Sequence, residues 1–129
     1  MGKRIHIIDD DPVVRNLLGI TLSKRGFEVS SSETAYQVFD MTDNFPDLFI
    51  LDVVMPGLNG FEVCKWIKGV SRSTQVILLS ATPGLKVLAS DSGADEYVEK
   101  PFETDALVSR IHQCFINRAT QEMYYDSSL

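Results

Sequence analysis

The 129-residue chain is predicted to fold as an α/β domain with a five-stranded parallel sheet. Short apolar runs recur at intervals of roughly 20 residues, and a segment with helical spacing follows each run. Four of the five runs lead to an acidic, hydroxyl or amine side chain, a pattern that random surface composition is not expected to produce. The length fits one domain.

The first predicted strand is Ile5–Ile8, in which His6 alternates with isoleucines and is expected to be packed rather than reactive. Asp11 is a good helix N-cap, and Pro12 is a good first helical residue. One face of this helix carries Val14, Leu17, Leu18, Thr21 and Leu22. Gly26 is expected to end the helix.

A weaker second strand is predicted at Phe27–Ser30. Either Ser31 or Ser32 can cap a second helix. The predicted inner face of that helix carries Ala35, Val38, Phe39 and Thr42. Phe45-Pro46 is expected to close it.

The third predicted strand, Leu48–Leu51, is continuously apolar, as expected for a strand that is buried on both faces of a sheet. It ends abruptly at Asp52, and Pro56-Gly57 then force a turn. A third helix is predicted to end at Gly69, with an apolar face at Phe61, Cys64 and Ile67.

The fourth strand is predicted at Val76–Leu79 and ends on Ser80. The helix after it is short and weakly patterned, with Leu85, Val87 and Leu88 as its apolar residues and Gly93 at the end of the segment. The fifth strand, Tyr97–Val98, runs into Lys100.

Thr104 is expected to cap a last helix, whose inner face carries Leu107, Val108, Ile111 and Phe115. From about Arg118 the chain is polar, and we expect a frayed tail there. The whole chain, residues 1–129, is therefore predicted to be one domain with a core at about 4–118 and a tail at 119–129.

The composition is that of an ordinary globular protein, with 44% hydrophobic and 23% charged residues. A net charge of −6 argues against direct nucleic-acid binding, because phosphate backbones are bound by basic surfaces. Cys64 and Cys114 lack metal-ligand spacing and fit a reduced, cytoplasmic protein. No apolar run approaches the ~20 residues of a membrane span, and no signal-peptide core follows Lys3-Arg4.

The side chains at the strand ends are expected to meet at one edge of the sheet, where open parallel sheets bind ligands. They are Asp9, Asp10, Asp52, Ser80 and Lys100. Clustered carboxylates repel one another unless a cation is present, and they favour a hard, partly hydrated ion such as Mg²⁺. Such a site suits phosphoryl transfer, in which a carboxylate can be the nucleophile and form an aspartyl-phosphate.

The sequence resembles the receiver (CheY-like) domain of bacterial two-component response regulators over about residues 4–118. The resemblance rests on four motifs in the family's order: IHIIDDDP, FILDVVMPGLNG, VILLSAT and YVEKPF. It implies a doubly wound, flavodoxin-like sheet in strand order 2-1-3-4-5, which sets the first and third strands side by side.

By this resemblance Asp52 is the phospho-acceptor and a ligand of Mg²⁺, with Mn²⁺ as an alternative ion. Asp10 is a direct metal ligand, and the backbone carbonyl of Val54 is another. Asp9 acts mainly through water. Asp11 is left as a structural N-cap.

The resemblance also makes Ser80 the switch hydroxyl, Tyr97 the switch aromatic and Lys100 the lysine that faces the phosphoryl group. A cis bond before Pro101 would aim this lysine into the crevice. The implied function is transfer of a phosphoryl group from a histidine kinase phosphohistidine to the acceptor, which changes the surface of the fifth strand and the last two helices. The domain assists its own phosphorylation and dephosphorylation and is not expected to be an enzyme.

The implied partners are a sensor histidine kinase or phosphotransfer protein, an effector domain or partner protein, and a second copy bound through the last two helices and the fifth strand. No nucleic acid or membrane is expected to bind directly. The segment between Ser80 and Lys100 is short for the family, so the fourth helix and the output face are expected to differ from those of better-known members.

Other functions share parts of this pattern. A haloacid-dehalogenase-like phosphohydrolase uses a strand-end aspartate and the spacing of Asp9 and Asp11, but it needs a further acidic pair after the lysine, where only one helix remains. A flavodoxin-like cofactor binder would not carry acids after its first strand, because they repel phosphate. The remaining alternative is a receiver that is not phosphorylated and serves as an interaction module.

Overall fold

The computed structural model describes residues 2–127, with side chains up to residue 123. Five parallel strands form one sheet in the order β2-β1-β3-β6-β7. Their bounds are β1 Arg4–Ile8, β2 Glu28–Ser32, β3 Leu48–Asp52, β6 Gln75–Ser80 and β7 Glu96–Glu99. The predicted strand order 2-1-3-4-5 is confirmed, because β6 and β7 are the fourth and fifth strands of this sheet.

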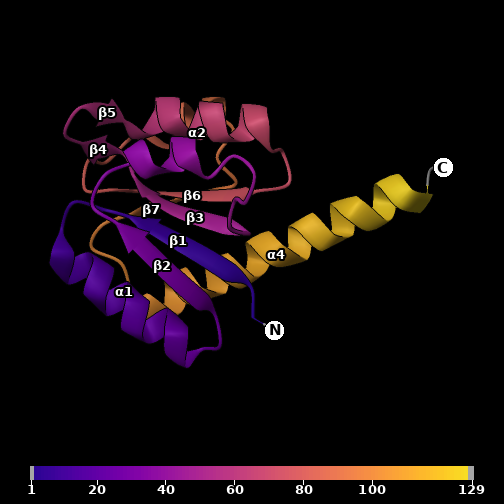
Figure 1. Ribbon diagram of the computed structural model, residues 1–129, viewed down its shortest axis with the longest axis horizontal. Helices are drawn as coiled ribbons and strands as arrows, with labels where there is room; N and C mark the ends of the chain where they lie inside the picture. Colours follow the sequence, from indigo (N-terminus) through magenta and orange to yellow (C-terminus); the bar gives the residue numbers. More distant parts are fainter. Residues whose placement is uncertain (1, 128–129) are drawn as a thin grey trace.

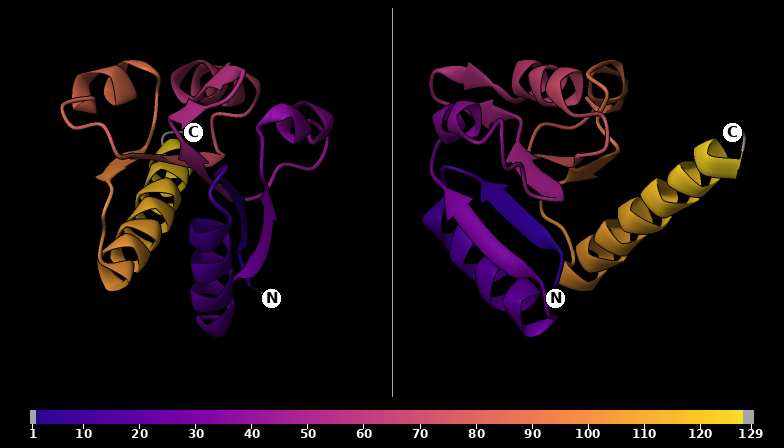
Figure 2. Two further views of the ribbon diagram at one scale, coloured as in Figure 1. Left: turned by 90° about the vertical axis from the view of Figure 1, so that its left-hand side faces the viewer. Right: turned by 45° about the vertical axis from the view of Figure 1, so that its right-hand side comes forward.

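Helices cover both faces of the sheet, so the predicted doubly wound α/β class is also confirmed (Figure 1, Figure 2). One face carries α1 (Pro12–Lys24) and the first half of α4 (Thr104–Ser127). The other face carries the 3₁₀ helix η1 (Tyr36–Asp40), α2 (Gly60–Val70) and α3 (Lys86–Asp91). Each layer buries apolar side chains against the sheet, which gives two cores.

Strand β3 lies at the centre of the sheet, and all of its residues are buried. Leu48 and Ile50 belong to the core under α1 and α4. Phe49 and Leu51 belong to the core on the opposite face. A strand that is buried on both faces must stay apolar until it reaches the edge of the sheet, and Asp52 is the first polar residue there.

The prediction of a full second helix is wrong. The segment after β2 forms only the short η1, and Ser31 and Ser32 belong to β2 instead of capping a helix. Pairing with β1 explains the difference, because the ring nitrogens of His6 bond the hydroxyls of Ser30 at 2.7 Å and Ser32 at 2.9 Å. Serines that bond a neighbouring strand are no longer available as helix caps.

His6 is buried, as predicted, and its tautomer follows from its partners. The Ser32 hydroxyl donates to the carbonyl of Thr34 at 2.9 Å, so it accepts from Nε2–H of His6. Nδ1 then accepts from the Ser30 hydroxyl. Burial lowers the pKa of His6 to about 4, which keeps the ring neutral near pH 7. His6 therefore ties the edge strand β2 to β1.

Aromatic packing covers the sheet where the second helix is shortened. The ring of Phe39 lies edge-on against Trp66 of α2, with 4.7 Å between centroids. Phe45 contacts both Trp66 and Phe49 in the same edge-on manner. Of the predicted inner face, Ala35 and Val38 are buried, whereas Phe39 is 40% exposed and Thr42 is exposed. Edge-on ring contacts thus replace part of the expected helix surface.

A small antiparallel hairpin follows Asp52 and was not predicted. It consists of β4 (Val54–Met55) and β5 (Leu58–Asn59). The predicted turn at Pro56-Gly57 joins the two strands, and Gly57 has a φ of 80°, which a glycine adopts readily. The Asn59 side chain then caps α2 by accepting from the backbone N–H of Phe61 at 2.8 Å.

Helices α2 and α3 differ from the expected ones, the first in its end and the second in its buried face. Helix α2 continues past Gly69 to Val70. Helix α3 is short, as predicted, but it buries Ala89 and leaves Val87 and Leu88 exposed. The weak helical pattern of apolar residues in α3 arises because its larger apolar side chains do not lie on the face that meets the sheet.

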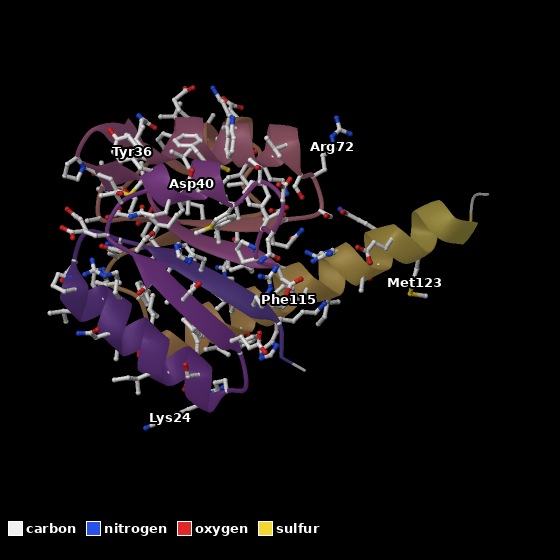
Figure 3. All side chains as sticks on the ribbon, viewed as in Figure 1. Lys24, Tyr36, Asp40, Arg72, Phe115 and Met123 are labelled. Carbon is white, nitrogen blue, oxygen red and sulfur yellow. The ribbon has the colours of Figure 1, made fainter. Side chains whose placement is uncertain are left out.

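The last helix is longer than predicted. The segment after Arg118, expected to be a frayed tail, continues as helix to Ser127, and residues 128–129 lie outside the described residues. Phe115 lies where α4 leaves the sheet, and Met123 lies on the part that projects away from it (Figure 3). Among residues 2–127, no helix is both long and apolar enough to cross a membrane.

Candidate functional site

Three carboxylates meet at the edge of the sheet where β1 and β3 end. The two strands are direct neighbours. Strand β1 ends just before Asp9, and β3 ends at Asp52. One carboxylate oxygen from each of Asp9, Asp10 and Asp52 lies within 4.8 Å of the others. Asp9 and Asp52 are buried, whereas Asp10 is exposed. This arrangement suits a hard cation that keeps part of its water shell.

Lys100 supplies the positive charge of this crevice. It follows β7, and its Nζ lies 2.7 Å from Oδ2 of Asp9 and 3.5 Å from Oδ2 of Asp52. Its backbone N–H donates to the carbonyl of Ser80 at 2.8 Å, which fixes the strand ends of β6 and β7 together. The Lys100-Pro101 bond is cis.

The pKa values of the buried groups reflect this charge balance. Burial raises the pKa of Asp52 above its ordinary value of 3.8, and the charge of Asp9 raises it further, while Lys100 acts in the opposite direction. Burial alone would lower the pKa of Lys100, but its hydrogen bond to Asp9 and the charge of Asp52 raise it overall. The raised pKa of Lys100 keeps this lysine protonated.

Backbone groups fix the orientation of the two buried acids. The N–H of Val54 donates to Oδ1 of Asp52 at 3.2 Å. The N–H of Asp11 donates to Oδ1 of Asp9 at 2.9 Å. Asp11 itself caps α1 by accepting from the N–H of Val13 at 2.9 Å, as predicted. Of the three clustered acids, Asp10 is the one that faces solvent.

The start of α2 packs directly against the backbone of Asp52. A Cβ added to Gly60 would lie 2.5 Å from the carbonyl oxygen of Asp52 and 2.6 Å from Cα of Val53. The N–H of Gly60 also donates to the carbonyl of Val53 at 2.8 Å. Only a residue without a side chain fits this approach.

Ser80 and Tyr97 share a contact with the loop after β6. The Ser80 hydroxyl is buried at the end of β6 and accepts from the N–H of Thr82 at 3.0 Å. The carbonyl of Thr82 accepts from the Tyr97 hydroxyl at 3.0 Å and from the Ser80 hydroxyl at 3.3 Å. The two side chains are therefore linked through one carbonyl group.

Two residues of this site were not found from the sequence. Thr82 acts through its backbone, so its side chain gives no signal. Arg15 lies on α1 and donates from Nη1 to the backbone carbonyl of Asp9 at 2.6 Å. Its signal would have been its position in the second turn of a helix that starts beside the acids, since helical side chains point toward the N-terminus.

Comparisons with known proteins agree with this geometry. A family model described as the response regulator receiver domain matches residues 5–112. The chain therefore belongs to the response regulator receiver domain family of two-component systems.

Curated relatives of this family are similar to the chain over part of their length. The chain is 36% identical over 114 residues to the response regulator MprA of Mycobacterium tuberculosis, an alignment that covers 86% of this chain and 50% of that protein. The chain thus spans about half the length of the curated relatives that it matches.

Two solved structures have the same fold. The CheY-like receiver domain protein of Methanospirillum hungatei superposes with a TM-score of 0.87 at 25% identity, covering 94% of this chain and 99% of that one. The response regulator TrrA of Thermotoga maritima, solved in complex with Mg²⁺ and BeF, superposes with a TM-score of 0.79 at 34% identity, covering 87% of this chain and 98% of that one.

Proposed function

We propose that Asp52 accepts a phosphoryl group from the phosphohistidine of a sensor histidine kinase or phosphotransfer protein. A carboxylate oxygen of Asp52 attacks phosphorus, the P–N bond breaks, and its electron pair returns to the imidazole. The observation that carries the proposal is the cluster of Asp9, Asp10 and Asp52 with Lys100 between the two buried acids. The domain assists this transfer and the later hydrolysis, and it is not an enzyme for another substrate.

The same residues suit Mg²⁺, or Mn²⁺ as an alternative. The ion would neutralise charge that develops on the phosphoryl oxygens. Asp10, Asp52 and the backbone carbonyl of Val54 would hold it directly. Asp9 would act through water, because its two carboxylate oxygens already accept from Asp11 and Lys100.

Lys100 and Ser80 have roles that follow from their positions. The Lys100 ammonium lies on the Oδ2 side of Asp52, where it would pair with an oxygen of the bound phosphoryl group. The Ser80 hydroxyl donates only in a long bond of 3.3 Å to the carbonyl of Thr82, so it would turn to donate to another phosphoryl oxygen. Tyr97 would respond, because its hydroxyl bonds the same carbonyl.

Labelling with acetyl phosphate tests the proposed function. We expect Mg²⁺-dependent phosphorylation that maps to Asp52 by mass spectrometry after borohydride reduction, and loss of the label when the metal is chelated. Asp10→Asn should slow labelling roughly 10-fold or more, because a metal ligand is lost.

Asp11→Asn is the matched control for this experiment. It removes the same charge from the next residue, yet asparagine is as good an N-cap as aspartate, so labelling should hardly change. Label on another residue, or equal labelling of the Asp10→Asn and Asp11→Asn variants, would contradict the proposed site.

The output surface that we propose lies over β7, between α3 and α4. The structure has a hollow of about 480 Å³ there, lined by Lys86, Tyr97, Glu99 and Arg110 among others. An effector domain, a partner protein or a second copy would read this surface. Within the chain, we propose a single receiver domain, residues 1–129, whose last helix extends beyond the core at about 4–118.

Ser80→Ala is expected to uncouple this surface from the site. A hydrogen bond to a charged phosphoryl group contributes about 1.5 kcal/mol or more, so its loss should shift the switch equilibrium roughly tenfold. The measurement is the change in ¹H–¹⁵N shifts of Tyr97 and Glu99 when Mg²⁺ and beryllofluoride are added. Ser73→Ala, at an exposed serine, is the control. Equal shift changes in both variants would rule out Ser80 as the switch.

A further inference from the structure

We propose that Arg15 is a positioning residue that holds the turn of Asp9 and Asp10 in the geometry needed for metal binding. The metal-binding role rests on the proposed function, whereas the hydrogen bond of Arg15 is observed in the structure whatever that function is. Arg15 lies in α1, is half-buried and carries a guanidinium that reaches back toward the end of β1.

The group that Arg15 binds lies outside the sheet ladder. Pairing of β1 with both β2 and β3 ends at Ile8. The carbonyl of Asp9 is therefore past the last strand pair, and Nη1 of Arg15 donates to it at 2.6 Å. A charged donor makes this one of the stronger kinds of hydrogen bond in a protein.

With this bond, Asp9 accepts three hydrogen bonds, besides the one that its backbone N–H donates to the carbonyl of Ser32 at 3.3 Å. Its Oδ1 accepts from the N–H of Asp11, its Oδ2 accepts from Nζ of Lys100, and its carbonyl accepts from Arg15. The first two bonds fix the side chain, and the third fixes the peptide that links Asp9 to Asp10. Arg15 therefore restrains the peptide group next to Asp10, from which the exposed carboxylate projects.

The placement of Arg15 is not explained by helix stability. A positive charge near the N-terminus of a helix is unfavourable, whereas Lys24 lies in the last turn of α1, where the helix dipole favours it. Arg15 lies in the first turns and points back to the N-terminal end. The bond to Asp9 accounts for a cation at this unfavourable position.

Positioning and simple charge screening predict opposite effects on metal affinity. If Arg15 acted only as a nearby positive charge, its removal would strengthen the binding of a divalent cation. If it positions the turn, its removal weakens binding, and groups that orient metal ligands typically contribute 10–100-fold to affinity. The direction of the change therefore separates the two roles.

The test is titration of the unphosphorylated full chain with Mn²⁺, in which electron paramagnetic resonance measures the free ion. We expect Arg15→Ala to weaken binding about tenfold and Arg15→Lys, which keeps a charged donor, to restore most of the affinity. Arg25→Ala is the matched control, because it removes a guanidinium from the C-terminal end of α1, where Arg25 pairs with Asp105 at the surface. Circular dichroism confirms that each variant is folded.

Amide signals give a second measurement that needs no metal. In ¹H–¹⁵N spectra, the amides of Asp10 and Asp11 should broaden or split in Arg15→Ala and stay sharp in Arg25→Ala. Unchanged or tighter Mn²⁺ binding by Arg15→Ala, or no Mn²⁺ binding by the unmodified protein, overturns the inference. Weakened Mn²⁺ binding by Arg15→Ala, found together with no labelling of Asp52 in the unmodified protein, supports the inference and refutes only the proposed function.

Discussion

Asp52→Asn is expected to abolish phosphoryl uptake and, at the same time, to stabilise the unphosphorylated protein. Uptake is lost because the amide is not a nucleophile for phosphorus. Stability increases because burial and the charge of Asp9 both raise the pKa of Asp52, which means that the folded protein holds this carboxylate at a cost. Lys100 keeps its partner in the variant, since its Nζ lies 2.7 Å from Asp9.

The gain in stability should depend on pH. An acid whose pKa is raised by folding favours the folded state below its ordinary pKa of 3.8, and this contribution is lost as the pH rises through the raised value. The two proteins should therefore be equally stable in strong acid and differ most near pH 7. A gain of about 1 kcal/mol would raise the midpoint of thermal unfolding by roughly 3–5 °C in a domain of this length.

The measurement is thermal unfolding of both proteins between pH 3 and pH 8, with and without Mg²⁺. The metal should stabilise the unmodified protein and have little effect on Asp52→Asn. Equal midpoints at pH 7 without metal would mean that Asp52 is not under electrostatic strain, and label uptake by the variant would rule out Asp52 as the acceptor.

Gly60→Ala is expected to damage both the fold and the site. A Cβ at this position meets backbone atoms at 2.5 Å and 2.6 Å, and backbone cannot move aside as a flexible side chain can. Overpacking of this kind costs roughly 2–3 kcal/mol. Because the atoms that must shift belong to Asp52 and Val53, labelling by acetyl phosphate should slow as well.

Gly69→Ala is the matched control, because it makes the same substitution in the same helix. A Cβ at Gly69 has no atom within 4 Å, so alanine should stabilise α2 by up to about 1 kcal/mol. Urea unfolding of the two variants should therefore give changes of opposite sign. If Gly60→Ala is as stable as the unmodified protein, the close approach of α2 to β3 is not a constraint on the fold.

The parts of the fold that depend on burial could be predicted from the sequence. The apolar runs of β1 and β3, which end at Asp9 and Asp52, come from the requirement that an interior strand be buried on both faces. The shortening of the second helix to η1 could not be predicted, because Ser31 and Ser32 are good helix caps when judged from the local sequence. Only the contacts of His6 with the edge strand show that this segment is needed for the sheet.

The charged and hydroxyl side chains at the strand ends could be predicted from the sequence, but the contacts that link them through backbone carbonyl groups could not. Carboxylates and a lysine at strand ends give a chemical signal in the sequence. The carbonyl groups of Asp9 and Thr82, which link Arg15 to the acids and Tyr97 to Ser80, give none. A role carried by a peptide group is independent of the side chain at that position, so only the structure reveals it.

The length of α4 has a mechanical consequence. Over residues 104–123, the buried residues of α4 all lie in its first half, and they are Leu107, Val108, Ile111 and Cys114. Farther along, Arg118 still pairs with Asp47, just before β3, at 3.5 Å. A helix of 24 residues is about 36 Å long. A tilt of about 10° at its base would therefore move its far end by roughly 6 Å. Helix α4 projects beyond its packed half (Figure 1), so a tilt about its base would move Ser127 about twice as far as it moves the end of the packed half at Cys114.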